Sequence, residues 1–157
     1  MASVRIIFIL YFFVSCVQPS GINEEERQSI LSSAKITLQN YFRDIRREGL
    51  LAEFRYLDST ADFFWVPPGY SSAISYDSVH TLLTKASPMY KAVDNSWQAI
   101  NIFPLSKELA SYTGKIHSKM TDISGNTIEM HLVETGLLVK KKDGWKLLCG
   151  QTTKLED

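Results

Sequence analysis

The sequence contains only two cysteines, Cys16 and Cys149, which excludes a scaffold held together by several disulfides. It also lacks an excess of charge of either sign, because 17 basic residues balance 17 acidic ones. This balance provides no field to attract nucleic acid, so we expect no nucleic-acid partner. The three histidines do not occur at metal-ligand spacings, and neither a glycine-rich phosphate loop nor a Gly-x-Ser-x-Gly motif is present. We therefore expect neither a metal nor an organic cofactor.

The apolar run at residues 6–17 is too short to cross a membrane as a helix, which needs about 20 residues. It follows a short segment with one positive charge and precedes the polar, turn-prone Gln18-Pro19-Ser20-Gly21. This arrangement is typical of a secretory signal peptide. We predict a signal peptide over residues 1–21, a single domain over residues 22–157, and export of the mature protein.

Cys16 is a candidate for lipidation. The segment Phe13-Val14-Ser15-Cys16 resembles a bacterial lipobox, although Phe13 stands where leucine is usual. In that case the protein is a periplasmic lipoprotein that associates with the membrane only through its lipid anchor. Ordinary cleavage near Ser20-Gly21 is the alternative, and it predicts a free secreted or periplasmic protein. Both outcomes leave Cys149 without a partner for an internal disulfide.

The first half of the domain has the periodicity of helices. Asn23 followed by Glu26 forms a capping-box pattern, and apolar residues recur at helical spacing from there to Gly49, which predicts one long helix. A short amphipathic helix is expected at residues 50–57. A third helix is expected to begin at Ser75 or Asp77 and to end before Pro88.

The second half has the period-two alternation of strands. Turns at residues 122–126 and at Asp143-Gly144 divide it into long antiparallel strands. Tyr112 is expected on the same face as Ile116 and Met120. In the last strand the alternation places Gln151 on one face with other residues: Trp145, Leu147 and Cys149. A shorter strand is predicted at residues 61–66, where Pro67-Pro68-Gly69 ends it.

This order of elements resembles the nuclear transport factor 2-like superfamily, in its SnoaL-like branch. The residues that carry the resemblance are Ala61-Asp62-Phe63-Phe64-Trp65, Asn101-Ile102-Phe103-Pro104-Leu105-Ser106, Asp122-Ile123-Ser124-Gly125 and Val139-Lys140-Lys141-Lys142-Asp143-Gly144-Trp145-Lys146. The match covers about residues 23–153. It implies an α+β cone, in which a strongly curved, mostly antiparallel sheet wraps around the long N-terminal helix and two shorter helices and encloses a pocket. Members include isomerases, cyclases and dehydratases, and also non-catalytic binding or oligomerising domains.

The resemblance also implies where a catalytic base would lie in enzymes of the ketosteroid isomerase type. That position falls near Pro67, which cannot accept a proton, and Asp62 is the nearest acid. Glu134 has two placements open to it, inward into the pocket or outward at a β-bulge near Gly136. Gln151 lies where related sequences often have a pocket histidine. The candidate ligand-binding residues are Tyr41, Trp65, Trp97, Tyr112, Glu134 and Gln151; for the tyrosines and tryptophans a purely structural core role is the alternative.

Without an evident acid–base pair, the sequence favours an exported SnoaL-like protein that binds a small, largely apolar molecule without transforming it. An isomerase, cyclase or dehydratase that uses Glu134 or Asp62 as base, with Tyr112 or Tyr41 as hydrogen-bond donor, is the first alternative. A domain that forms homodimers through the outer face of its sheet is the second.

Overall fold

The computed structural model describes residues 21–156, so the predicted signal peptide with Cys16 lies outside the described residues except for Gly21. The elements, in chain order, are α1 (Glu24–Glu48), η1 (Leu50–Arg55), β1 (Phe64–Val66), β2 (Ile74–Ser75), α2 (Tyr76–Ala86), η2 (Ser87–Met89), β3 (Tyr90–Pro104), β4 (Leu109–Asp122), β5 (Thr127–Lys141) and β6 (Gly144–Lys154). Within residues 21–156, no helix is long and apolar enough to cross a membrane. The predicted order of elements is confirmed.

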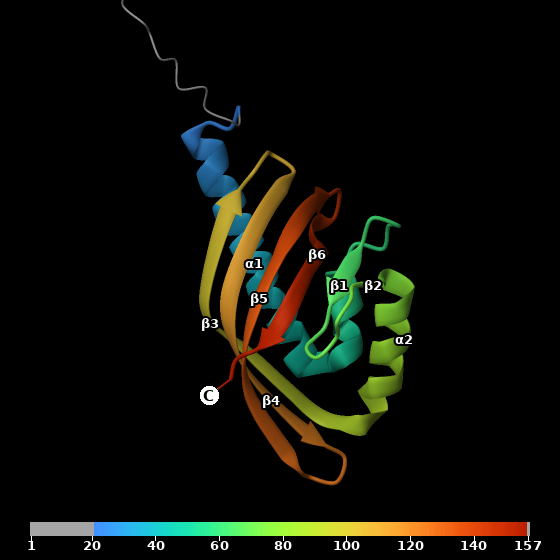
Figure 1. Cartoon of the computed structure of the whole chain (residues 1–157). Coiled ribbons are helices and arrows are strands. Elements are labelled where there is room, and N and C mark those ends of the chain that lie inside the picture. Colours follow the sequence, from blue (N-terminus) through green and yellow to red (C-terminus); the bar gives the residue numbers. More distant parts are fainter. Residues whose placement is uncertain (1–20, 157) are drawn as a thin grey trace, which may run out of the picture.

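One six-stranded sheet, with strand order β2-β1-β6-β5-β4-β3, forms the body of the fold. Its strands are antiparallel except that β1 runs parallel to β6. The sheet curves around α1, and α2 lies beside β1 and β2 at the other side of the molecule (Figure 1). The β4–β5 hairpin extends beyond the end of β6 and curls below α2 (Figure 1). The fold is therefore the predicted α+β arrangement of a curved, unclosed sheet and helices.

Helix α1 begins and ends where its sequence predicts. The Glu26 amide donates to Asn23 Oδ1 at 2.8 Å, and the Asn23 amide donates to Glu26 Oε2 at 3.1 Å, which completes the capping box. Gly49 ends the helix with a φ of 88°, a conformation that favours glycine. The side of α1 that faces the sheet buries Ile30, Ala34, Leu38, Tyr41, Phe42 and Ile45. Burial of this stripe holds the helix against the sheet.

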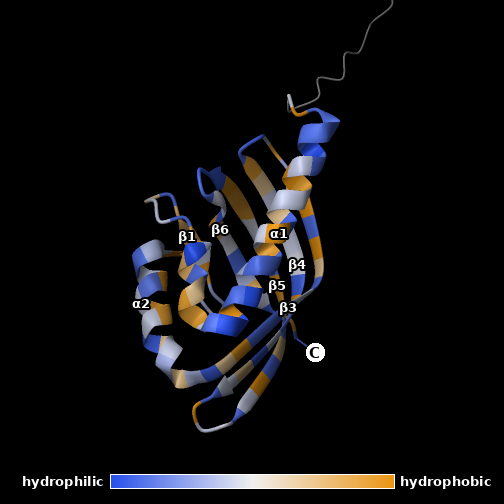
Figure 2. Cartoon of the chain, turned by 180° about the vertical axis from the view of Figure 1, so that it is seen from behind, coloured by the Kyte–Doolittle hydropathy of each residue, from blue (hydrophilic) through white to orange (hydrophobic). Residues whose placement is uncertain are grey.

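The two faces of the long strands differ in polarity, and apolar and polar residues alternate along the ribbons (Figure 2). On the concave face Tyr112 and Ile116 are buried beneath α1, whereas Lys115 and Thr135 are exposed on the convex face. The convex face is the surface through which homodimerisation is predicted, and that pairing stays a prediction.

The expected face of Gln151 is wrong, because β6 contains a bulge. Leu138 pairs with Leu147 while the adjacent Leu137 pairs with Cys149, so Leu148 is an extra residue on β6. One extra residue reverses the alternation of every residue that follows. Gln151 is consequently exposed on the convex side with Cys149, and the buried Thr152 takes the inward position.

Candidate functional site

A cavity of about 220 Å³ lies between the concave face of the sheet and the helical elements α1, η1 and α2. Its walls are mostly apolar and come from every part of the fold: Phe42, Leu50, Pro67, Pro68, Val79, Leu82, Leu83, Val93, Ile116, Met120, Met130 and Leu132. Two carboxyl groups, Glu53 and Glu134, also line it. Concave, mostly apolar sites with a few convergent polar groups are typical ligand sites.

A larger surface groove of about 790 Å³ lies beside the β5–β6 turn, but its charged groups are already paired. Lys141 Nζ lies 3.0 Å from the Asp58 carboxylate, and Lys146 Nζ lies 2.8 Å from that of Asp143. Charged groups that are paired in this way do not require a ligand to compensate their charge. The smaller internal cavity is therefore the candidate site.

Glu134 is fixed at one end of this cavity by two hydroxyl groups. Tyr112 Oη donates to its Oε1 at 2.7 Å, and Thr152 Oγ1 donates to its Oε2 at 3.1 Å. Trp65 Nε1 in turn donates to Thr152 Oγ1 at 3.2 Å. The Glu134 residue is 5% exposed. Strands β1, β4, β5 and β6 thus position one buried carboxyl through a continuous chain of hydrogen bonds.

Glycines make this arrangement sterically feasible. A Cβ at Gly136 would lie 2.7 Å from the carbonyl oxygen of Cys149 and 3.0 Å from the Tyr112 ring. A Cβ at Gly150 would lie 2.8 Å from the Trp65 ring. The two glycines pair with each other across β5 and β6. Their missing side chains let both aromatic rings lie close to the strands and reach the hydrogen-bonded chain.

Glu53 provides the second carboxyl from η1. Its pKa is raised to about 7: burial is the main cause, a hydrogen bond with Tyr41 opposes the rise, and the negative charge of Glu134 adds to it. Sequence analysis did not identify Glu53. A signal was present, however, because Glu53 follows Leu50 by three residues and therefore lies on the same side of the short helix as this buried leucine.

The electrostatics of the two carboxyls are linked. Burial raises the pKa of Glu134 to about 7 as well, and the hydrogen bonds from Tyr112 and Thr152 oppose that rise. Burial and the nearby carboxyls raise the pKa values of Tyr41 and Tyr112 well above the ordinary value, so both phenols stay protonated donors at neutral pH. Two interacting carboxyls titrate as a pair. Near neutral pH each of these carboxyls is therefore present in both its protonated and its ionised form.

Several solved structures have the same architecture as this chain. A candidate scytalone dehydratase from Novosphingobium aromaticivorans has a TM-score of 0.75 at 10% identity, covering 85% of this chain and 89% of its own. A candidate dehydratase of the NTF2-like family from Streptomyces avermitilis has a TM-score of 0.71 at 13% identity, covering 83% and 99%. This chain has the nuclear transport factor 2-like (NTF2-like) fold.

A third structure with the NTF2-like fold, hexachlorocyclohexane dehydrochlorinase from Novosphingobium barchaimii, has a TM-score of 0.67 at 9% identity and covers 85% of this chain and 92% of its own. No family model matches the sequence, and no curated protein matches it significantly. The similarity at these identities lies in the fold, so the chemistry of the site has to be argued from its own residues.

Within the NTF2-like fold, the predicted site residues have different fates. Tyr41, Trp65 and Glu134 line the cavity, and Tyr112 lies behind Glu134 as its hydrogen-bond donor. Trp97 stacks on Phe42 with ring centroids 4.7 Å apart, and its Nε1 donates to the carbonyl oxygen of Leu38 at 2.9 Å, which is a core role. Whether the cavity residues bind a ligand stays a prediction.

Other polar residues singled out by the sequence lie away from the cavity. Asp62 is exposed at the start of the β1 segment and does not line it. The rings of His117 and His131 lie side by side on the convex face in a tilted arrangement, with centroids 5.2 Å apart, and His117 contacts Glu129. Among residues 21–156, no group of three or more histidine, cysteine, aspartate or glutamate side chains could hold a metal ion. The polar groups that line the candidate site are carboxyl, phenol, hydroxyl, amide and indole groups.

Proposed function

We propose that the cavity is the active site of an enzyme that transfers protons on a small, largely apolar molecule. The observation that carries this proposal is that Glu53 and Glu134 share one apolar cavity and both have a pKa of about 7. A general acid or base is most effective when its pKa lies near the working pH. Carboxyls with strongly raised pKa values in a cavity are typical of catalytic sites.

The hydrogen bonds assign different roles to the two carboxyls. Glu134 accepts from two hydroxyls, those of Tyr112 and Thr152, and both bonds favour its ionised form. Glu53 has one opposing hydrogen bond, with Tyr41. On this basis we assign the proton to Glu53 when the pair holds a single proton. Glu134 is the general base, and Glu53 is the general acid.

This division of roles suits reactions that begin with loss of a proton from carbon. The Glu134 carboxylate removes a proton from a carbon next to a carbonyl group, and the electron pair of that C–H bond moves toward the carbonyl oxygen. In an isomerisation Glu53 donates its proton to that oxygen to give an enol, and Glu134 then returns the proton it took to another carbon of the conjugated enol while Glu53 recovers its own from the enol hydroxyl. In an elimination the electron pair instead forms a carbon–carbon double bond as the bond to a hydroxyl group on the next carbon breaks, and Glu53 protonates this departing hydroxyl, which leaves as water. The base needs only hydrogen-bond reach to the carbon acid.

Two observations support this reaction class over simple binding. The structures of similar fold include two dehydratase candidates and a dehydrochlorinase. The sequence-based expectation of a non-catalytic binding protein rested on the absence of an acid–base pair, and Glu53 with Glu134 supplies one. Export, which the leader sequence predicts, is a separate proposal that this chemistry neither requires nor opposes.

Hydrogen exchange in deuterium oxide tests the proposal without knowledge of the natural substrate. We expect the mature domain to catalyse deuterium incorporation next to the carbonyl group of p-hydroxybenzylacetone, followed by proton NMR. Glu134→Gln should reduce the rate about a hundredfold or more, because loss of a general base has effects of that order. Glu108→Gln, at an exposed position outside the cavity, is the matched control and should exchange at the wild-type rate.

Equal exchange rates in the wild type and Glu134→Gln would overturn the proposal. Binding of the ketone without any catalysed exchange would also overturn it, and would favour the non-catalytic binding protein instead.

A further inference from the structure

The cavity has a second polar end, which the carboxyl chemistry does not use. On β3 and β4, Asn95 pairs with Ser118, and Ser118 also pairs with Met130 on β5. Asn95, Ser118 and Met130 all line the cavity. Of these, Ser118 is 3% exposed. This end belongs to the part of the sheet that extends beyond β6, because β6 pairs with β5 only as far as Leu132.

The side chain of Asn95 carries a hydrogen-bond acceptor that lacks a donor among the described residues. Its Oδ1 is buried, and within residues 21–156 it has no hydrogen-bond partner. Buried polar groups are nearly always hydrogen-bonded, and each exception needs an explanation. Asn95 lines the cavity, and rotation of its terminal amide about a broad torsion brings this oxygen to the cavity surface, where a donor on a ligand can satisfy it. The atom therefore indicates where a ligand has to carry a donor.

This acceptor and the carboxyls lie at opposite ends of the cavity. Glu134 and Met130 are four residues apart on β5, which is roughly 13 Å along a strand. The walls between them are apolar: Val79, Leu83, Val93, Ile116 and Leu132. The cavity volume of about 220 Å³ is smaller than the roughly 300–1,000 Å³ of drug-sized ligand sites. A matching molecule is small and elongated, with polar groups only at its two ends.

The charges near Asn95 favour a neutral donor over a cationic one. Arg46 donates to the backbone oxygen of Asn95 at 3.2 Å and is paired with Asp94. This pair is internally neutral, and the cavity residues around Asn95 include no carboxyl: Val93, Ser118, Met120 and Met130. Burying an ammonium group here would lack a compensating charge. A hydroxyl group carries the required donor without that cost.

From this geometry we infer that the cavity selects hydroxylated, otherwise apolar small molecules, such as phenols or alicyclic alcohols, by a hydrogen bond from their hydroxyl group to Asn95. The inference rests on the proposed function only in that the end of the molecule away from the hydroxyl is the reacting end. Recognition of the hydroxyl itself is a matter of binding and can be measured without any reaction.

Two probes that differ by one hydroxyl group test the inference. Binding of p-hydroxybenzylacetone and benzylacetone to the mature domain is measured by titration calorimetry or NMR shifts. We expect the hydroxylated probe to bind roughly tenfold or more tightly, because a partner that leaves the buried oxygen unpaired is penalised by about that factor. Asn95→Leu should abolish the preference and bind the two probes within about twofold of each other.

Asn101→Leu is the matched control. Asn101 lies on the same strand, is exposed and pairs with Thr113 outside the cavity, so this variant should keep the wild-type preference. Thermal unfolding provides a readout without a ligand: Asn95→Leu should melt at least as high as the wild type, because it removes an unpaired buried polar group.

Three results would overturn the inference. They are equal affinities of the wild type for the two probes, no binding of the hydroxylated probe up to its solubility limit, and a preference that survives in Asn95→Leu. Selective binding without deuterium exchange would leave the inference standing and would overturn only the proposed function. Deuterium exchange without a preference for the hydroxylated probe would overturn the inference and leave the proposed function standing.

Discussion

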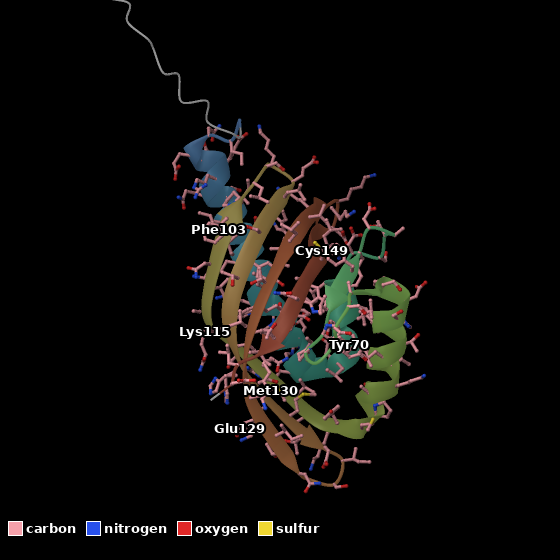
Figure 3. All side chains as sticks on the ribbon, viewed as in Figure 1. Tyr70, Phe103, Lys115, Glu129, Met130 and Cys149 are labelled. Carbon is pink, nitrogen blue, oxygen red and sulfur yellow. The ribbon has the colours of Figure 1, made fainter. Side chains whose placement is uncertain are left out.

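Glu129 and Glu134 lie on the same strand, five positions apart, and point to opposite faces of the sheet. Glu129 is exposed on the convex face, where Lys119 at 2.8 Å and His117 at 3.2 Å lower its pKa (Figure 3). Glu134 faces the cavity, where burial raises its pKa to about 7 although two hydroxyls donate to it. One residue type on one strand therefore provides either a permanent surface charge or a group that titrates near neutral pH.

The comparison teaches that removal of water decides whether a carboxyl in this fold titrates near neutral pH, even where hydrogen bonds favour its charged form. Glu129 has cationic partners in solvent, where an exposed pair contributes little to stability. Glu134 has neutral donors in an apolar cavity, where its charged form is costly. Only the second environment produces a group suited to proton transfer.

The largest expected difference between the two residues is in catalysis. Glu53→Gln and Glu134→Gln should each reduce catalysed deuterium exchange about a hundredfold or more, because each removes one partner of an acid–base pair. The double variant should lose little beyond either single one, since residues that act as a unit are not additive. Glu129→Gln should exchange at the wild-type rate. If the losses of rate in the double variant were fully multiplicative, Glu53 and Glu134 would act independently and not as an acid–base pair.

The dependence of stability on pH should separate the same residues. The folded-state pKa of Glu134, about 7, lies above its ordinary value of 4.5, so between these pH values the folded state binds more protons than the unfolded state. The contribution of Glu134 to the stability of the folded state is therefore fully present below pH 4.5 and is lost as the pH rises to 7. We expect Glu134→Gln to be more stable than the wild type at pH 8 by about 2–3 kcal/mol, and by much less at pH 5.

Chemical unfolding at the two pH values measures this difference. Glu129→Gln should show no such dependence between pH 5 and pH 8: the pKa of Glu129 is lowered from 4.5, so its stabilising contribution is present above that value and is lost only on further acidification. A Glu134→Gln variant that is less stable than the wild type at pH 8 would contradict the cost assigned to the buried charge.

Packing beneath the carboxyl provides a smaller effect. Gly136→Ala places a Cβ 2.7 Å from the carbonyl oxygen of Cys149 and 3.0 Å from the Tyr112 ring, so backbone and ring both have to move. We expect a loss of about 1–3 kcal/mol of unfolding free energy, as for overpacked cores. Thr135→Ala, at the adjacent exposed position, should change stability by about 0.5 kcal/mol or less. Denaturant unfolding of the two variants measures the contrast.

Sequence patterns predicted much of this fold because those patterns are local. The capping box at Asn23 and Glu26, the glycine stop at Gly49 and the period-two alternation of β4 each depend on residues close together in the chain. The same alternation predicted correctly that Tyr112 and Ile116 share the buried face.

The candidate site was predictable only in part, because its decisive features are not local. The bulge at Leu148 arises in the pairing of β5 with β6, and it exchanges Gln151 for Thr152 at the cavity. The proximity of Glu53 to Glu134 depends on how η1 packs against the sheet. The helical spacing of Glu53 and Leu50 indicated a shared side, but nothing in the spacing indicated a second carboxyl opposite.

The smallest expected effect concerns the hydrogen bond that distinguishes Glu134 from an unsupported buried acid. The Tyr112 hydroxyl favours the carboxylate, so Tyr112→Phe should raise the pKa of Glu134 further, by about one unit for the loss of one buried hydrogen bond to a charged group. The rising limb of the exchange rate against pH should shift upward by the same amount. Tyr70→Phe, at an exposed position (Figure 3), should leave the profile unchanged. A downward shift in Tyr112→Phe would mean that the tyrosine stabilises the protonated acid, and Glu134 would then be the proton donor of the pair.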